Sequence, residues 1–145
     1  MKRDAHIHTP FCPHGSPDSF EQYIEKAITQ QFTHMTFTEH APLPKSFVDP
    51  TPDQDSGMNE THLEKYFTTL HKLKKLYAKD ISISIGLEVD FIQGYERETT
   101  QFLNTYGREL DDAILSVHFL QLVDRYTGID GSADEFLSVG KRIGS

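Results

Sequence analysis

Three histidines, His6, His8 and His14, lie within nine residues near the start of the chain. His6 and His8 are two residues apart, so on a β-strand their side chains point to the same face. Neutral imidazole is the commonest metal ligand in proteins, and two imidazoles on one strand face can hold a single ion. The competing interpretation is a polar strand end with chance histidines, and the His-x-His pattern alone does not separate the two.

Further ligand-type residues stand near the ends of three later stretches that alternate like strands, 35–40, 81–91 and 113–119. In the second and third stretches, Glu88 and His118 lie on the face opposite the apolar residues. In a parallel β/α barrel the carboxyl ends of the strands form the rim that carries the active site. We therefore predict one metal site built from His6, His8, His14, His40, Glu88 and His118. A glutamate among imidazoles is suited to bridge two cations.

The stretches between these strands predict helices. The first helix is expected over about 17–31, capped by Ser16, with Pro17 in its first turn. A second helix is expected to follow a cap at Asn59, and a third to cover about 95–106. Strands that alternate with helices are typical of βα units and a parallel sheet, so the expected fold class is α/β.

Two regions lack a regular pattern. Residues 41–57 contain four prolines, which exclude helix and sheet interior. A loop of that length in a compact domain is often functional, so we interpret it as a lid or rim over the site, with a disordered excursion as the alternative. After Leu120 the alternation weakens: 124–132 is turn-like, and 133–143 is expected to form a short helix.

The composition of the chain limits the classes of binding partner that are expected. The formal net charge of −8 argues against a nucleic-acid surface, which is normally basic. A phosphorylated small molecule remains compatible if bound metal supplies positive charge. The single cysteine, Cys12, allows no disulfide within the chain and agrees with a reducing cytoplasm. No apolar run is long enough to span a membrane, so no membrane partner is expected.

The order of these motifs resembles that of the PHP (polymerase and histidinol phosphatase) family. The resemblance is carried by residues 4–9 with His14, then 38–41, 86–90 and 116–118. The longer patterns over 9–15 and 37–44 resemble the L-histidinol-phosphate phosphatase branch of that family. Together the motifs are specific, although each alone is weak, and they cover about residues 2–120.

The resemblance implies a distorted (β/α)7 barrel with parallel strands and a cluster of up to three divalent ions, zinc, iron or manganese. It implies that His6, His8 and Glu88 hold the first ion and that Glu88 bridges to a second ion shared with His118. His14 and His40 would hold the third ion. The expected nucleophile is a metal-bound hydroxide, so no side chain is assigned as catalytic.

The sequence departs from the family pattern in its second half. The family needs later ligands, yet no histidine follows His118, and only four strands are expected. A β/α barrel usually takes about 250 residues. We therefore expect residues 1–145 to be one incomplete PHP-like domain, with a weakly matched tail over 121–145. The expected consequences are poor stability, self-association or a missing C-terminal half; a naturally small metal-binding protein is the alternative.

The expected reaction is metal-dependent hydrolysis of a phosphomonoester, with L-histidinol phosphate converted to L-histidinol in histidine biosynthesis. The alternatives are another PHP-type phosphoesterase, namely a phosphotyrosine phosphatase or a nuclease, or a non-catalytic metal-binding or partner domain. The expected partner is a small phosphorylated substrate, and the expected location is the cytoplasm. Lys45 and Arg3 are basic residues that could contact phosphate, but no pattern singles them out.

Several residues receive supporting or structural roles. Asp4, Glu39 and Asp90 are candidates for orienting the ligand imidazoles, with solvated or capping carboxylates as an equally strong alternative. Cys12 is interpreted as an inert turn residue rather than a reactive thiol. We expect no metal binding by the remaining histidines near the second strand and helix, which are His34, His62 and His71.

Overall fold

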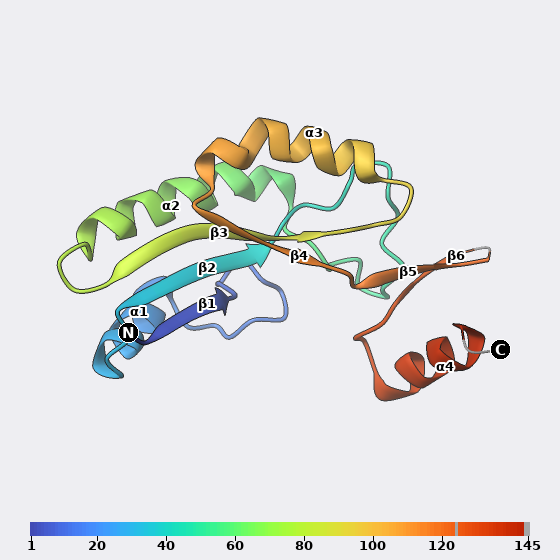
Figure 1. The fold of residues 1–145 in the computed structure, drawn as a ribbon, viewed down its shortest axis with the longest axis horizontal. Coiled ribbons are helices and arrows are strands. Elements are labelled where there is room, and N and C mark those ends of the chain that lie inside the picture. Colours follow the sequence, from blue (N-terminus) through green and yellow to red (C-terminus); the bar gives the residue numbers. More distant parts are fainter. Residues whose placement is uncertain (124, 144–145) are drawn as a thin grey trace.

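The computed structural model describes residues 1–123 and 125–143 and contains a four-stranded parallel sheet (Figure 1). The strands lie in chain order: β1 (Arg3–Ile7), β2 (His34–His40), β3 (Ser82–Asp90) and β4 (Asp112–Ser116). Three helices connect them: α1 (Phe20–Thr29), α2 (Leu63–Leu76) and α3 (Glu96–Tyr106). Short 3-10 turns precede α2 at Glu60–His62 and follow α3 at Gly107–Glu109. The predicted α/β alternation with parallel strands is confirmed.

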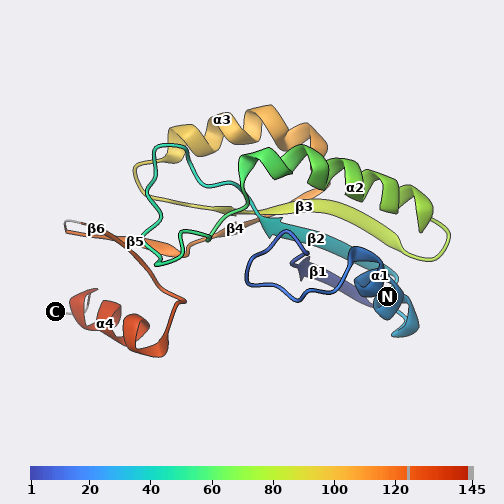
Figure 2. The same cartoon turned by 180° about the vertical axis from the view of Figure 1, so that it is seen from behind.

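The hydrophobic core lies between the sheet and the helices, with β3 as its most completely buried strand. Figures 1 and 2 show α2 and α3 on one face of the sheet. Every second residue of β3 points into the core, and Ile85 and Leu87 are fully buried. Helical spacing places five buried side chains of α2 against the sheet: Leu63, Tyr66, Phe67, Leu70 and Leu73. Each buried side chain of this size contributes about 1.5–3 kcal/mol, so this layer fixes the position of β3.

Tyr66 links α2 to the backbones of the two central strands. Its buried hydroxyl lies 2.8 Å from the Gly86 carbonyl oxygen and 3.2 Å from that of Phe37, and it accepts the Glu39 N–H at 3.4 Å. Burial raises the pKa of Tyr66, so the phenol stays protonated and able to donate. At Gly86 a Cβ would lie 2.9 Å from the Thr38 methyl carbon, so the close approach of β2 and β3 requires glycine.

The first helix begins later than its sequence predicts. Its N-cap is Ser19, not Ser16, and it starts at Phe20. Ser19 accepts the Gln22 N–H at 3.3 Å, while the Gln22 side chain accepts the Ser19 N–H at 2.6 Å. The Ser16 hydroxyl instead donates to Asp18 at 2.5 Å. The reciprocal capping box at Ser19 satisfies two backbone N–H donors at once, which explains why the helix begins there.

The fourth strand is shorter than predicted, and the following segment is more regular. β4 ends at Ser116, and β5 (Phe119–Leu122) pairs antiparallel with β6 (Arg125–Gly128). The continuous strand predicted over 113–119 is therefore wrong, and so is the turn-like assignment at 125–128. Residues 129–132 are irregular as predicted, and Asp124 lies outside the described residues. The break coincides with the His118 N–H donating to Asp90 at 3.2 Å instead of continuing the ladder.

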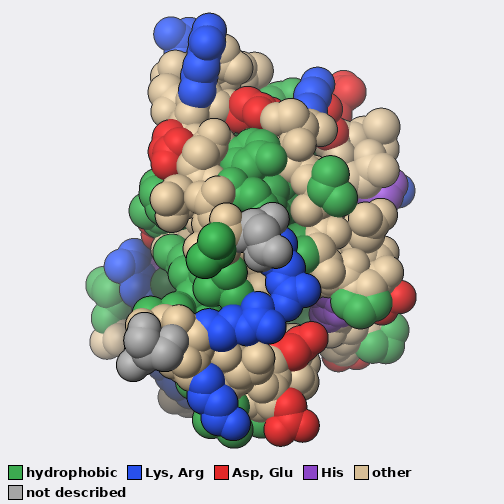
Figure 3. All heavy atoms as spheres, turned by 90° about the vertical axis from the view of Figure 1, so that its right-hand side faces the viewer, with side chains coloured by type: hydrophobic (Ala, Val, Ile, Leu, Met, Phe, Trp, Pro, Cys, Tyr) green, Lys and Arg blue, Asp and Glu red, His purple; other side chains and the backbone are tan. Residues whose placement is uncertain are grey.

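The last helix, α4 (Ala133–Ile143), forms where the sequence predicts a short helix. It lies beyond the hairpin and away from the sheet (Figure 1). Its Val139 is buried, whereas Phe136 and Leu137 are 60% and 59% exposed. Seen from this end of the molecule, hydrophobic side chains gather beside lysines and arginines (Figure 3). Of the helices in the described part of the chain, none is long and apolar enough to cross a bilayer.

The proline-rich loop over 41–57 follows β2 and is held by hydrogen bonds to β3 and within the loop. The Ala41 N–H donates to the Glu88 carbonyl oxygen at 2.8 Å. Buried Asp49 accepts the Thr51 N–H at 2.9 Å and the Ser56 N–H at 3.0 Å. Hydrogen bonds keep the pKa of the Asp49 carboxyl below its ordinary value, although burial opposes them. The loop is therefore an ordered part of the surface around the strand ends.

Candidate metal centre

Glu88 occupies the centre of the candidate site. Its side chain is 3% exposed and lies in β3, between His40 on β2 and the end of β4. The strand register places His40 directly beside Glu88, because the two residues are Cα partners in the parallel ladder. Four imidazole nitrogens lie within 3.6 Å of its two oxygens: His6 at 3.0 Å, His8 at 3.4 Å, His40 at 3.6 Å and His118 at 3.5 Å.

The two carboxylate oxygens of Glu88 face different strands. Oε2 faces His6, His8 and His40 from the β1 and β2 side. Oε1 faces His118 and accepts the Ser116 hydroxyl from the β4 side. Burial opposes ionisation, but the hydrogen bonds from Ser116 and His6 hold the pKa of the Glu88 carboxyl below its ordinary value. An ionised carboxylate with imidazoles on both oxygens has the donor arrangement of a bridging ligand.

The donor chemistry of these residues fits divalent metal. Three groups have all their ligand atoms within 4.8 Å of one another: His6, His8 and Glu88; His40, Asp90 and His118; and His8, Cys12 and His40. The Nδ1 atom of His40 is buried and lacks a hydrogen-bond partner among the described residues. A buried ring nitrogen left in this state is costly unless a ligand satisfies it. Imidazole and carboxylate ligands suit zinc, iron or manganese.

Two carboxylates orient the imidazoles that face Glu88. Glu39 lies 3.2 Å from Nδ1 of His8, and Asp90 lies 2.8 Å from Nδ1 of His118. These hydrogen bonds raise the pKa of His8 and of His118, against the effect of burial. At His40 burial dominates and lowers the pKa of the ring. Hydrogen bonding thus favours the protonated form of His8 and His118, and burial favours the neutral form of His40.

The other residues singled out in the sequence occupy varied positions. His14 is 58% exposed and lies 3.1 Å from Asp55, outside the three groups above. It still lines a cavity of about 920 Å³ together with His40 and His118. Lys45 lies elsewhere, 3.0 Å from Glu60.

The sequence interpretation missed residues that line this large cavity from the C-terminal segment. They come from the β5–β6 hairpin, the turn after it and α4, and include Arg125, Asp130 and Glu135. No periodicity marks 125–132, so only the charge of these residues could have drawn attention to them. Cys12 was interpreted as an inert turn residue, yet its sulfur lies with His8 and His40. Burial raises the pKa of the Cys12 thiol.

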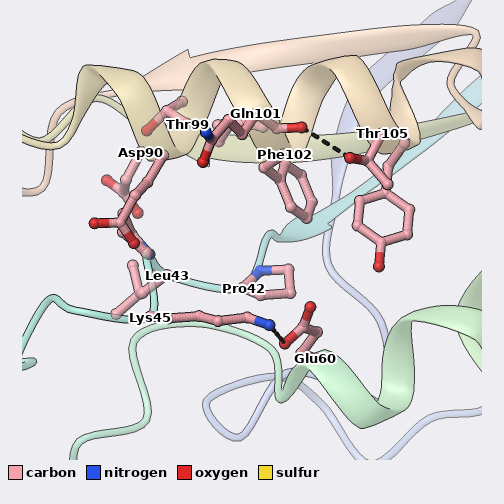
Figure 4. A pocket seen from close by; sticks show the side chains of 13 residues that line it. Pro42, Leu43, Lys45, Glu60, Asp90, Thr99, Gln101, Phe102 and Thr105 are labelled. Atoms are coloured by element: carbon pink, nitrogen blue, oxygen red, sulfur yellow. Dashed lines mark hydrogen bonds and ion pairs between the residues drawn. The ribbon is translucent and has the colours of Figure 1, made fainter.

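A second cavity, of about 260 Å³, lies under α3 and contains no histidine (Figure 4). Its walls include Phe102 of α3 and Pro42 of the proline-rich loop. The Lys45–Glu60 ion pair stands at its edge in Figure 4. Asp90 also lines this cavity, whereas none of the candidate histidine ligands does.

Known proteins share both the sequence and the fold. The chain matches the PHP domain over residues 4–139, beyond the stretch 2–120 that carries the motifs. It is 53% identical to the histidinol-phosphatase of Bacillus subtilis over 145 residues, which is all of this chain and 54% of that protein.

Two solved structures resemble the fold. The HisK protein of Listeria monocytogenes superposes with a TM-score of 0.88 at 42% identity, over 93% of this chain and 52% of that one. The histidinol phosphate phosphatase of Lactococcus lactis was solved in complex with zinc, L-histidinol and phosphate. It superposes with a TM-score of 0.67 at 28% identity, over 85% of this chain and 41% of that one. The chain thus spans about half the length of the relatives it matches, and its sheet is part of a PHP-type barrel. With the domain match covering most of its length, the chain belongs to the PHP family.

Proposed function

We propose that this chain is the metal-bearing N-terminal part of a phosphatase that hydrolyses L-histidinol phosphate to L-histidinol. The observation that carries the proposal is Glu88, buried and surrounded by four imidazole nitrogens within 3.6 Å. The 53% identity to a histidinol-phosphatase supports the choice of substrate. Such an enzyme would act in histidine biosynthesis, and we assign it to the cytoplasm.

The proposed ligand sets are those implied by the family resemblance, and the first of them coincides with a group of neighbouring ligand atoms. His6, His8 and Glu88 would hold one ion, and His118 with Glu88 a second, to which Asp90 is near enough to contribute. His14 and His40 are proposed for a third. Divalent ions, when bound, supply Lewis acidity and lower the pKa of a water molecule. We propose zinc first, because the Lactococcus lactis relative is a zinc complex; iron and manganese suit the same donors.

The protein side chains would bind and orient the substrate in the large cavity beside the histidines. Arg125 lines this cavity and offers a guanidinium for the phosphate oxygens. Asp55, Asp130 and Glu135 line it too, and their carboxylates complement the amino group of L-histidinol. A cavity lined by a guanidinium and several carboxylates suits a substrate with a phosphate at one end and an amine at the other.

Activity of the isolated chain is proposed to be low. The chain supplies few ligands for each ion, and its relatives are about twice as long. A reacting phosphate must be held accurately, since a displacement of about 1 Å can cost roughly 100-fold in rate. We therefore propose that full metal binding and turnover need the second half of the barrel, supplied in the same chain or as a separate one.

A non-catalytic metal-binding domain is the second candidate, favoured by the half-length match alone. Phosphate release from L-histidinol phosphate in the presence of zinc separates the two candidates. We expect little release by the chain itself and substantial release once the C-terminal half of the Bacillus subtilis relative is added. Phosphotyrosine and a short oligonucleotide serve as competing substrates.

The matched controls are Glu88→Gln, which should abolish release, and Glu109→Gln, a surface exchange of the same type that should leave it unchanged. Absence of release from L-histidinol phosphate with both halves and metal present would contradict the phosphatase proposal. Preferred hydrolysis of phosphotyrosine or oligonucleotide would replace the substrate assignment.

A further inference from the structure

Glu39 is a buried carboxylate inside the ring of candidate ligands, and all of its acceptor capacity is used by protein donors. Its side chain is 1% exposed. Oε1 accepts from the His8 ring at 3.2 Å and from the His40 N–H at 2.9 Å. Oε2 accepts the Thr9 N–H at 2.8 Å and the Thr9 hydroxyl at 2.5 Å. A carboxylate has about four acceptor positions, so these four donors leave none for an ion.

We infer that Glu39 is a positioning residue that fixes the tautomer and aim of the His8 ring and is not itself a metal ligand. A carboxylate accepts only from a protonated ring nitrogen, so Glu39 places the proton of neutral His8 on Nδ1. The lone pair then remains on Nε2, which lies 3.4 Å from Glu88. The inference rests on the proposed metal site, because it assigns which nitrogen of His8 would bind the ion.

Glu39 also joins the two backbone segments that carry the ligands. Through Thr9 it holds the turn after β1, whose next hydrogen bond runs from the Cys12 N–H to the Thr9 carbonyl at 2.9 Å. Through the His40 N–H it holds the end of β2. Its own backbone N–H is fixed by the Tyr66 hydroxyl at 3.4 Å, from the side of α2. One side chain thus sets the spacing between His8 and His40, whose ring centroids lie 4.5 Å apart.

Asp90 makes a related contact with His118 but does not support the same conclusion. It accepts both the ring Nδ1 and the backbone N–H of His118 through the single oxygen Oδ1. It also belongs to a group with His40 and His118 whose ligand atoms lie within 4.8 Å of one another. Asp90 therefore has the geometry of a ligand, whereas Glu39 does not.

The test reads the His8 tautomer directly, in the metal-free 145-residue chain. Long-range ¹H–¹⁵N correlation spectra of the histidine rings at pH 9 should show His8 protonated on Nδ1. Glu39→Gln should change that tautomer and lower the Zn²⁺ affinity by about 10–100-fold, the usual cost of losing an outer partner of a ligand. Glu109→Gln should change neither, and Thr9→Val, which keeps the carboxylate, should keep the tautomer.

The outcomes separate the possible roles of Glu39. His8 protonated on Nε2 in the unsubstituted chain would overturn the inference without any variant, even if Glu39→Gln fails to fold. Loss of one whole zinc equivalent in Glu39→Gln, with the His8 tautomer unchanged, would make Glu39 a ligand and also overturn it. A chain that binds no zinc but shows the Nδ1 tautomer would contradict the proposed function and leave the role of Glu39 standing.

Discussion

The inner strand β3 and the edge strand β4 differ sharply in how completely they are covered. Leu87 of β3 is fully buried, whereas Leu115 of β4 is 68% exposed, although both point toward the face that the helices cover. Val117, just after β4, is 45% exposed. In the described part of the chain, β4 has β3 as its only neighbour in the sheet. The difference shows that the sheet is packed at β3, where Glu88 lies, and open to solvent at β4.

The largest effect is expected when one leucine on each strand is truncated, which tests the difference in burial between β3 and β4. Leu87→Ala should lower the free energy of unfolding by about 2–5 kcal/mol, because it empties a packed site. Leu115→Ala should change it by no more than about 0.5 kcal/mol, as for an exposed position. Urea denaturation of the two variants and the unsubstituted chain measures both. Equal losses would mean that β4 is covered in solution, and a dependence on protein concentration would identify self-association as the cover.

A second test compares zinc binding at different pH values at the two ends of the site, His8 after β1 and His118 after β4. Hydrogen bonds to Glu39 and Asp90 raise the pKa of His8 and of His118, so protons compete with metal at a higher pH than for an ordinary imidazole. Metal binding needs neutral rings. Zn²⁺ affinity should therefore fall by about tenfold or more between pH 8 and pH 6, beginning above the ordinary histidine value. Competition against a chelator of known pH dependence measures it, and a flat profile would contradict these assignments.

The smallest effect is expected from the histidines outside the site. His34 contacts Thr33 at 2.9 Å, His71 contacts Glu109 at 3.1 Å, and His62 packs beside Phe11. Replacement of all three by glutamine should leave the bound zinc unchanged, as measured by metal analysis after gel filtration. A loss of one equivalent would show that the site extends beyond the strand ends.

The parts of the site that depend on strand alternation could be predicted from the sequence. Glu88 opposes an apolar face in a stretch with regular alternation, and His40 ends the neighbouring strand, so a parallel ladder brings them together. The pairing of His8 with Glu39 could not be predicted as a contact, because the two residues are 31 positions apart and lie in different segments. That contact depends on the turn after β1, whose shape no periodicity encodes.

In the fold, too, features set by local sequence pattern could be predicted, and features set by contacts between distant segments could not. Alternation predicts that Leu115 lies on an apolar face but cannot tell whether anything covers that face. The β5–β6 hairpin was missed because Arg125–Gly128 carries no alternating pattern, and its pairing comes from contacts with Phe119–Leu122. The N-cap of α1 was misplaced because Ser16 and Ser19 are both suitable caps, and only the partner Gln22 decides between them.

The most direct test of the account is a zinc titration of the chain beside Glu88→Gln. Glu88 is the one side chain that contacts imidazoles from both sides of the site, so its loss should remove the common ligand. We predict measurable zinc binding by the unsubstituted chain and a loss of affinity on the order of 100-fold or more in Glu88→Gln, with Glu109→Gln unchanged. Equal zinc affinity and stoichiometry in a folded Glu88→Gln variant would contradict a metal centre built around Glu88.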